Sequence, residues 1–592
     1  MNRILLVFAF FLATLAGCKR DVSHTGTPDP QPNIVNPEPV TATIQGNVYN
    51  ENNDPAAGVL IKVGIKTATT DAKGYFRILN APLDKHASLV TAEKAGYFKA
   101  LRSFSATAAT NNVSIKLVKK SLTGSVNGTT GGDVTLANGS KISLPANGIV
   151  LQGSGAAYTG TINVYAAYID PTTNDISQTI PGSLMADDKN GSRVTLASYG
   201  MLAVELETAG GQKLQVKNGS KATLTAPIPS TMLGSAPATI PMWYLDEASG
   251  IWQEEGSATK SGSSYSGQVS HFSFWNYDVN LPGVNLSLKI TTGSQPLVHA
   301  LVKLTASAYP SSSYGFTDSL GQVSGLVPSN QQLVMQVLDQ CHNVIYTQNV
   351  GPFTQNTTLA PIALAGGTSN AIITVQGSLK NCSGNAVTDG YAIISHGNNY
   401  RYVAVDANGN FTTNFMQCPG SSSPTIQVLG VDNGTTQQGN PVTTNVTMPV
   451  TNAGNISACG TSSAQFMSFT YNGNNYYLTG VDSIGGNTFN APTGGFTTSL
   501  SAAINSPMQM IYMSFNHSTA TTGTPYTVNN YMSVYVNGTS AYTQGATNVQ
   551  VTFTNFPTAM GQFYEGHFSG TFNSGGAVHT ITNGTFRLRR DN

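Results

Sequence analysis

The sequence Asp71-Ala72-Lys73-Gly74-Tyr75-Phe76 returns twice along the chain, as Asp318-Ser319-Leu320-Gly321-Gln322-Val323 and as Asp406-Ala407-Asn408-Gly409-Asn410-Phe411. In each copy the Asp side chain bonds its own backbone to open a tight turn, and the Gly supplies the positive φ that closes it. The apolar residue two positions after the Gly is then expected to enter a core. Each copy therefore predicts a turn between two strands of a β-domain.

Two short apolar segments precede each turn, with the lengths and composition of strands. These segments are 44–48 and 58–61 in the first copy, 288–290 and 301–304 in the second, and 374–379 and 392–394 in the third. The three spans resemble the carboxypeptidase regulatory-like domain, a transthyretin-like sandwich of seven strands. The resemblance implies accessory or spacer modules without catalytic residues, and we place them at residues 43–118, 285–368 and 369–462.

The block between the first two copies has a different pattern. It opens with Gly131-Gly132-Asp133-Val134-Thr135-Leu136, and it closes with His271-Phe272-Ser273-Phe274-Trp275-Asn276. These features resemble the β-sandwich module shared by netrin receptors and ankyrins, which implies one large sandwich over residues 119–284. All three Trp of the chain lie in this block, and we expect them to anchor its core.

Alternating apolar runs separated by Gly, Asn and Pro recur along the whole chain, whereas helical periodicity is almost absent. We predict an all-β fold of tandem β-sandwich domains, transthyretin-like or Ig-like, with a separate C-terminal β-domain at 463–592. Its closing segments, 567–572 and 580–588, resemble the closing hairpin of terminal domains in Bacteroidetes lipoproteins. That resemblance assigns no ligand to the domain.

Charge is scarce in this chain. Its 592 residues include 28 Lys+Arg and 28 Asp+Glu, so only 9% are charged and the formal net charge is zero. Ordinary soluble domains carry about 25% charged residues. The basic footprint of a nucleic-acid-binding protein is missing, and nucleic acid is therefore not expected as a partner.

The first eighteen residues resemble the signal sequence of a bacterial lipoprotein. The apolar run 4–12 is too short to span a membrane, and Leu15-Ala16-Gly17-Cys18 resembles a lipobox. The resemblance implies a signal peptide of residues 1–17 and a lipid on Cys18. Five prolines between Thr25 and Val40 indicate a stiff, extended linker, which we place at residues 18–42. We expect an outer-membrane lipoprotein of the cell envelope, periplasmic or surface-exposed, in a Bacteroidetes-type cell; an ordinary signal peptide is the alternative.

Four further cysteines remain, an even number in an oxidising compartment. Counting reversals of strand direction places Cys382 and Cys459 at the same end of the third repeat. The same count places Cys341 opposite Cys418 across the junction of the second and third repeats. We predict the disulfides Cys382–Cys459 and Cys341–Cys418, with buried or free thiols as the alternative. No Cys-x-x-Cys or His-x-x-x-His spacing indicates a metal site, and none is expected.

Motifs of the common catalytic sites are absent from the sequence, including Gly-x-Ser-x-Gly, His-Glu-x-x-His and the phosphate-binding loop. The pairs Asp187-Asp188 and Glu254-Glu255 have the residue types of a glycosidase acid and base. Neighbours on a strand point to opposite faces, however, so neither pair is expected to converge on one bond. We predict that the chain is not an enzyme and needs no cofactor.

One tripeptide could cleave its own backbone. In some death-domain adaptor proteins with related modules, a His-Phe-Ser at the corresponding place cleaves itself. The resemblance implies a cut between Phe272 and Ser273, with Ser273 as nucleophile and His271 as base. The same tripeptide recurs at His567-Phe568-Ser569 in an unrelated context. An ordinary alternating strand gives the same pattern and is the preferred interpretation.

Together these features predict a non-enzymatic, lipid-anchored protein, a rod of β-sandwiches that presents a binding or adhesive surface. The 25 Tyr against 3 Trp suit polar contacts with glycans or proteins. The expected partners are the membrane, through the lipid, and a glycan or a surface protein. The alternatives are a glycan-binding component of a polysaccharide uptake system and the self-cleaving module.

Overall fold

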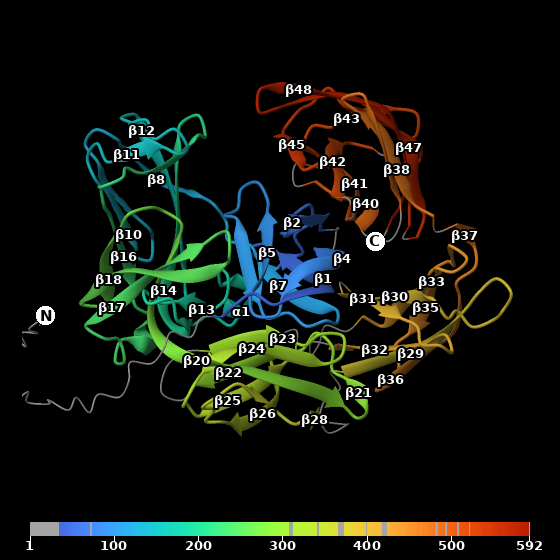
Figure 1. Cartoon of the computed structure of the whole chain (residues 1–592), viewed down its shortest axis with the longest axis horizontal. Coiled ribbons are helices and arrows are strands. Elements are labelled where there is room, and N and C mark those ends of the chain that lie inside the picture. Colours follow the sequence, from blue (N-terminus) through green and yellow to red (C-terminus); the bar gives the residue numbers. More distant parts are fainter. Residues whose placement is uncertain are drawn as a thin grey trace, which may run out of the picture.

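The computed structural model describes residues 35–590 with short gaps, and it is built almost entirely of strands (Figure 1). The gaps fall at 71–73, 307–311, 340–341, 365–371, 398, 417–422, 463, 480–482, 492–493, 506–507, 520 and 560. Paired sheets enclose separate hydrophobic cores along the chain, as alternating apolar and polar residues require. The predicted all-β class of tandem sandwiches is confirmed.

The first repeat is a sandwich of seven strands in two sheets, ordered β4-β1-β7 and β3-β2-β5-β6. Its strands are β1 (Pro39–Tyr49), β2 (Leu60–Val63), β3 (Lys66–Thr69), β4 (Tyr75–Asp84), β5 (Ser88–Glu93), β6 (Ala100–Phe104) and β7 (Asn111–Lys116). Strands β1 and β7 pair in parallel, and all the other pairs in this unit are antiparallel.

The next unit, which we call the Trp module, runs from β8 to the first half of β20. Its elements are β8 (Leu122–Asn127), β9 (Gly132–Thr135), β10 (Lys141–Leu144), β11 (Ile149–Leu151), β12 (Thr161–Ile169), α1 (Ile176–Thr179), β13 (Met185–Asp187), β14 (Arg193–Thr208), β15 (Lys213–Val216), β16 (Ala222–Pro227), η1 (Ser230–Met232), β17 (Thr239–Asp246), β18 (Ile251–Ser261), β19 (Ser264–Val269) and β20 (Phe274–Thr292). Trp243, Trp252 and Trp275 are fully buried, so the three Trp anchor its cores as expected.

Strand β20 belongs to two units at once. Its first half pairs with β14 and β17 of the Trp module, and its second half pairs with β24, β27 and β28 of the second repeat. The other strands of the second repeat are β21 (Gln295–Pro296), β22 (Leu301–Ala306), β23 (Ser312–Phe316), β24 (Gln322–Pro328), β25 (Leu333–Leu338), β26 (Val344–Val350), β27 (Thr357–Thr358) and β28 (Ile362–Leu364). The predicted boundary between residues 284 and 285 therefore lies inside one unbroken strand.

The third repeat pairs the sheet β32-β29-β36 with the sheet β31-β30-β33-β34-β37, from which β35 branches. Its strands are β29 (Ile372–Lys380), β30 (Gly390–His396), β31 (Asn399–Ala404), β32 (Asn410–Met416), β33 (Thr425–Asp432), β34 (Gln437–Gln438), β35 (Val442–Asn445), β36 (Val450–Ser457) and β37 (Thr461–Ser462). A disulfide joins Cys382, just after β29, to Cys459, just after β36, as the strand count predicts. Cys341 and Cys418 lie outside the described residues, so their predicted pairing stays a prediction.

The C-terminal domain packs the sheet β39-β38-β48-β47-β46-β43 against the sheet β40-β41-β42-β44-β45. Its strands are β38 (Phe466–Tyr471), β39 (Asn474–Thr479), β40 (Ser483–Asn490), β41 (Phe496–Asn505), β42 (Met508–His517), β43 (Pro525–Thr527), β44 (Tyr531–Val536), β45 (Thr539–Gln544), β46 (Gln550–Asn555), β47 (Phe563–Ser574) and β48 (Ala577–Arg589). In Figure 1 the second of these sheets faces the first repeat.

The repeated turn has the geometry that the sequence predicts. In the third repeat the backbone N–H groups of Asn408 and Asn410 donate to one carboxylate oxygen of Asp406, at 2.9 and 2.8 Å. Gly409 has a φ of 79°, which is in the left-handed region that favours glycine. Phe411, two residues later, is buried in the core. The second repeat builds its turn in the same way.

The first repeat lies in the middle of the molecule and contacts the other units (Figure 1). Toward the Trp module, the Lys116 ammonium lies 2.6 Å from the carboxylate of Asp175. Toward the second repeat, the side-chain amide of Asn112 donates to the carbonyl oxygen of Thr317 at 2.9 Å. Both neighbours of the first repeat are therefore held by specific polar contacts.

Contacts on the other side of the first repeat reach the third repeat and the C-terminal domain. The ring of Tyr75 lies 5.1 Å from the ring of Tyr400, inside a small shared apolar cluster. The hydroxyl of Thr67 in β3 donates to the sulfur of Met510 in β42. Segments more than 300 residues apart in sequence thus lie side by side.

The last strand of the C-terminal domain contacts the third repeat. The guanidinium of Arg589 in β48 donates to the side chains of Gln438, at 3.2 Å, and Tyr391, at 3.1 Å, both in the third repeat. The other four units therefore gather around the first repeat, and this differs from the extended rod that the sequence predicts. The repeats and turns show where each domain begins, but the inter-domain contacts depend on side chains far apart in the chain.

Candidate functional site

The six-stranded sheet of the C-terminal domain presents one face to solvent. The residues that alternate inward, such as Met467, Phe553 and Phe586, fill the core, so their neighbours on each strand point outward. Five outward residues stand opposite one another in register across β46, β47, β48, β38 and β39, in the order Thr552, His567, Thr585, Ser468 and Tyr477. Neighbouring strands lie about 4.8 Å apart, so this row spans about 19 Å. We call it the hydroxyl row.

An aromatic pair ends the hydroxyl row at the edge strand β39. Tyr477 is 61% exposed, and its ring stacks on that of Phe466 with centroids 5.9 Å apart and planes at 21°. Nearer the centre of the row, the hydroxyls of Ser468 and Thr585 share a hydrogen bond of 2.7 Å. The face therefore offers a flat aromatic surface beside hydroxyl groups that both donate and accept hydrogen bonds.

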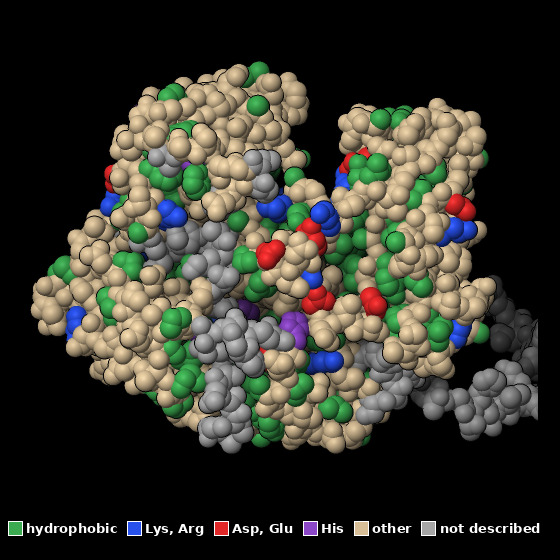
Figure 2. Space-filling view, turned by 180° about the vertical axis from the view of Figure 1, so that it is seen from behind, with side chains coloured by type: hydrophobic (Ala, Val, Ile, Leu, Met, Phe, Trp, Pro, Cys, Tyr) green, Lys and Arg blue, Asp and Glu red, His purple; other side chains and the backbone are tan. Residues whose placement is uncertain are grey.

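Charge is almost absent from this domain. Residues 463–592 include six charged side chains: Asp482, Glu565, Arg587, Arg589, Arg590 and Asp591. On the sheet that carries the hydroxyl row, Arg587 pairs with Glu565 at 2.8 Å, and the buried Arg589 bonds to the third repeat. On the face of the molecule drawn in Figure 2, charged side chains are few compared with uncharged ones. The hydroxyl row is therefore suited to an uncharged partner.

The tripeptide His271-Phe272-Ser273, for which self-cleavage was the alternative interpretation, lies just before β20. The imidazole of His271 packs on the rings of Tyr244 and Trp275 and lies 3.8 Å from the Glu255 carboxylate. Burial lowers the pKa of His271, while Glu255 acts in the opposite direction. The hydroxyl of Ser273 donates to the carbonyl oxygen of Phe274 at 3.1 Å. No hydrogen bond joins these two side chains in the described structure, so His271 is not placed to take the Ser273 proton.

The backbone of Phe272 in this tripeptide is held by the side chain of one glutamine. The side chain of Gln215 in β15 accepts the N–H of Phe272 at 2.6 Å and donates to the carbonyl oxygen of the same residue at 3.0 Å. This two-point pairing continues the hydrogen bonding of a strand. The geometry fits the strand interpretation of the tripeptide better than self-cleavage.

The two acidic pairs come close together, because β13 and β18 pair in parallel. Asp187 forms an ion pair with Arg193 at 2.6 Å, and Asp188 accepts two backbone N–H groups of its own turn. The carboxylate of Glu254 accepts the backbone N–H of Lys189 at 3.1 Å. The carboxylates are therefore engaged in local structural contacts. The proximity of the two acidic pairs was not predictable from the sequence, because no local sequence pattern indicates that β13 and β18 pair in parallel.

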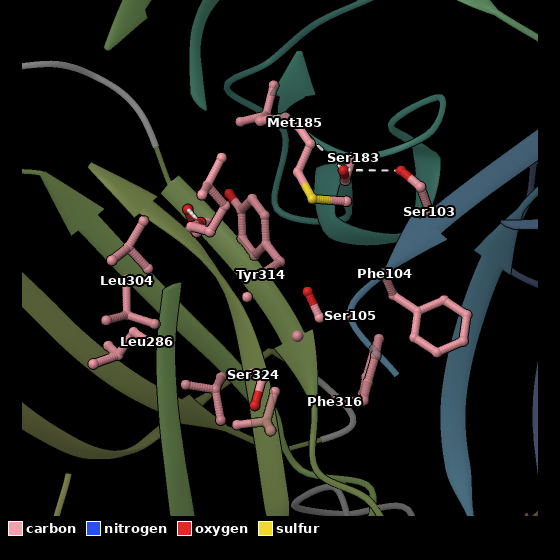
Figure 3. A pocket seen from close by; sticks show the side chains of 18 of the residues that line it. Ser103, Phe104, Ser105, Ser183, Met185, Leu286, Leu304, Tyr314, Phe316 and Ser324 are labelled. Carbon is pink, nitrogen blue, oxygen red and sulfur yellow. Dashed lines mark hydrogen bonds between the residues drawn. The ribbon is translucent and has the colours of Figure 1, made fainter. Parts of the chain in front are cut away.

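A cavity of about 80 Å³ lies where the first repeat, the Trp module and the second repeat meet (Figure 3). Its walls are mostly apolar and include Met185, Leu286 and Leu304, and the hydroxyls of Ser103 and Ser183 hydrogen-bond to each other at 2.9 Å beside it. Its one charged lining residue among the described ones is Arg102, which is 6% exposed. Arg102 was not among the residues expected to form a site, although a lone Arg inside the short strand Ala100–Phe104 is a signal that the sequence carries.

No cluster of three or more His, Cys, Asp or Glu side chains among the described residues is arranged to hold a metal ion. No helix in that part of the chain has the length and apolar composition needed to cross a membrane. Cys18 lies outside it.

No family model matches the sequence. Among curated proteins, human cartilage intermediate layer protein 2 is 29% identical over 121 residues, which cover 20% of this chain and 10% of that protein. The mouse protein of the same name is 29% identical over 140 residues, covering 22% of this chain and 12% of that protein. The chain thus spans about a tenth of the length of these relatives.

The solved structures that match parts of the chain include a bacterial shaft pilin and a Bacillus anthracis protein. The shaft pilin SpaA from Lactobacillus rhamnosus GG is 10% identical, and the match covers 30% of this chain and 96% of that chain at a TM-score of 0.16. The Bacillus anthracis TIE protein is 10% identical, covering 83% of this chain and 74% of that chain at a TM-score of 0.13. These scores are far below 0.5, so the likenesses support no conclusion about the function of this chain.

Proposed function

We propose that this chain is a non-enzymatic, lipid-anchored protein of the cell envelope whose C-terminal domain binds an uncharged glycan along the hydroxyl row. The observation that carries the proposal is the row itself, an exposed line of hydroxyl and imidazole groups that ends at the stacked pair Phe466 and Tyr477.

A neutral glycan matches this face in chemistry. Sugar hydroxyls are donors and acceptors, as are the Thr and Ser hydroxyls of the row. The exposed ring of Tyr477 is a flat amphipathic platform against which an apolar sugar face packs. The positive charge of Arg587 beside the row is balanced by the Glu565 carboxylate, so this arginine attracts an ionic ligand only weakly. Binding is therefore expected to change little with salt, because screening acts on charges.

The envelope location rests on two supports. The lipobox-like sequence at Cys18 implies an acylated N-terminus, and two or more acyl chains give a stable anchor. The disulfide Cys382–Cys459 is of the kind that persists in oxidising compartments outside the cytosol. A lipid at Cys18 would hold the units at the membrane and leave the C-terminal sheet available to a polymer.

The glycan proposal is tested on a glycan array with the purified chain. Thr585 in β48 and Thr539 in β45 are both exposed Thr residues in strands of the C-terminal domain, and only Thr585 belongs to the hydroxyl row. We expect wild type and Thr539→Arg to bind the same neutral glycans and Thr585→Arg to lose them. The absence of any bound glycan, or equal loss in both variants, would contradict the proposal.

The anchor is tested separately by mass spectrometry of the N-terminal peptide from a membrane fraction. We expect a chain that begins at Cys18 and carries acyl chains, and we expect Cys18→Ala to leave the membrane fraction. An unmodified Cys18 in a soluble mature chain would contradict the anchor and leave the glycan proposal standing.

A further inference from the structure

The cavity between the first repeat, the Trp module and the second repeat owes part of its volume to a missing side chain. On β24 the side chains of Val323 and Val327 enter the core of the second repeat, and Gly325 stands between them on the same face. A Cβ built on Gly325 would meet no heavy atom within 4 Å. A Gly in a strand interior often marks a place where another group approaches.

Arg102 brings a positive charge to this cavity without a carboxylate to balance it. Its guanidinium donates to the carbonyl oxygens of Ser177 and Ile180, at the end of α1. It forms no ion pair within the described residues, and Tyr314 is the neighbour that interacts with its charge. Burial lowers the pKa of Arg102 to about 10, so the side chain remains protonated at neutral pH. An unbalanced buried cation favours an anion beside it.

The other residues that line the cavity limit the size and the chemical character of such an anion. Leu286, Leu304 and Met185 supply an apolar surface, and Figure 3 shows these side chains and Tyr314 around one common space. A cavity needs about 10–15 Å³ of such volume to hold one water molecule, so a cavity of about 80 Å³ admits only a small ligand of several non-hydrogen atoms. A guanidinium recognises a carboxylate with paired hydrogen bonds.

We propose that this cavity binds a short-chain monocarboxylate of about three to five carbon atoms. Its carboxylate lies toward Arg102 and its hydrocarbon tail occupies the space beside Gly325. The ligand contacts three units at once, so binding holds the first repeat, the Trp module and the second repeat in the observed arrangement.

The experiment is isothermal titration of the full chain with sodium butyrate, sodium octanoate and 1-butanol in buffers of equal ionic strength. We expect butyrate to bind about tenfold or more tightly than either of the others, because octanoate exceeds the cavity and butanol lacks the charge. No binding of butyrate, or equal binding of butyrate and butanol, would overturn the proposal.

Two variants separate binding from folding. Gly325→Val adds a side chain to the cavity wall and leaves Arg102 in place. Its Cβ would meet no heavy atom within 4 Å, so the variant is expected to fold and to bind butyrate about tenfold or more weakly than wild type does. Arg102→Met keeps the apolar bulk and is expected to bind butyrate no better than butanol. A well-folded Gly325→Val chain that binds butyrate as wild type does would place the ligand elsewhere and overturn the proposal.

Discussion

At the scale of single residues, Asp278 is an acidic group without exposed surface. It is fully buried in β20, where the side-chain amide of Asn276 donates to one of its carboxylate oxygens and the other oxygen has no partner. Burial raises the pKa of Asp278 well above its ordinary value. The Trp module therefore carries a carboxyl group that destabilises it whenever the group is ionised.

This burial gives a pH-dependent prediction for Asp278→Asn. The unfolded carboxyl titrates near pH 3.9, so between about pH 4 and the raised folded pKa the folded state binds more protons. The unfolding free energy of wild type therefore falls as pH rises through this window, by about 1.4 kcal/mol for each unit of pKa elevation. We expect Asp278→Asn to unfold at a higher temperature than wild type at pH 7, with the advantage shrinking toward pH 4. Calorimetry at pH 7 and pH 4 measures the difference in unfolding temperature between Asp278→Asn and wild type. An equal difference at both pH values would contradict the prediction.

The structural role of a residue was predictable where it depends on neighbours in sequence. It was not predictable where it depends on residues far away in the chain. The turn at Asp406 and the pairing of Cys382 with Cys459 followed from the sequence, because strand direction and turn chemistry are local properties. Arg102 in β6 and Gly325 in β24 line the same cavity only in the folded chain. The hydroxyl row also depends on strand register, which one sequence does not fix.

At the scale of elements, the disulfide after β29 and β36 links the ends of two strands that already pair in parallel. The bridge closes a loop with a sequence separation of 77 residues. A crosslink of this span restricts the unfolded chain and stabilises the fold by about 2–4 kcal/mol. The third repeat, whose core is small, is expected to depend on it.

We therefore expect Cys459→Ser to lower the unfolding free energy of the third repeat by about 2–4 kcal/mol. Hydrogen exchange of β29, β30 and β33, compared between wild type and variant, localises the loss to this unit. The C-terminal domain serves as the internal control, since its core shares no residue with the third repeat. Unchanged exchange in the third repeat would show that the bridge adds no stability.

At the scale of the whole molecule, the first repeat contacts units that the sequence predicts to follow one another in an extended rod. Its contacts are a salt bridge, hydrogen bonds and the ring pair Tyr75 and Tyr400, and the end of β48 docks on the third repeat. Continuous pairing along β20 couples the Trp module to the second repeat. The arrangement leaves the sheet with the hydroxyl row on the outside.

Small-angle scattering of the purified chain tests this arrangement. A compact chain of this length has a radius of gyration of about 25 Å, and a straight rod of five sandwiches would be roughly twice as large. We expect about 25–30 Å for wild type. Arg589→Ala removes the two hydrogen bonds to the third repeat and is expected to increase the radius modestly. A wild-type value near that of the rod would contradict the gathered arrangement.

The central claim, that the C-terminal domain binds a neutral glycan along the hydroxyl row, is tested most directly by one affinity comparison. Tyr477 and Tyr542 are exposed to similar degrees, 61% and 57%, but they lie on different sheets of the domain. Titration of the full chain with a glycan found on the array is predicted to show about a two- to tenfold loss of affinity for Tyr477→Ala, because one stacking contact is worth about 0.5–1.5 kcal/mol. Tyr542→Ala is predicted to bind as wild type does. Unchanged affinity in Tyr477→Ala, or the same loss in Tyr542→Ala, would contradict the claim.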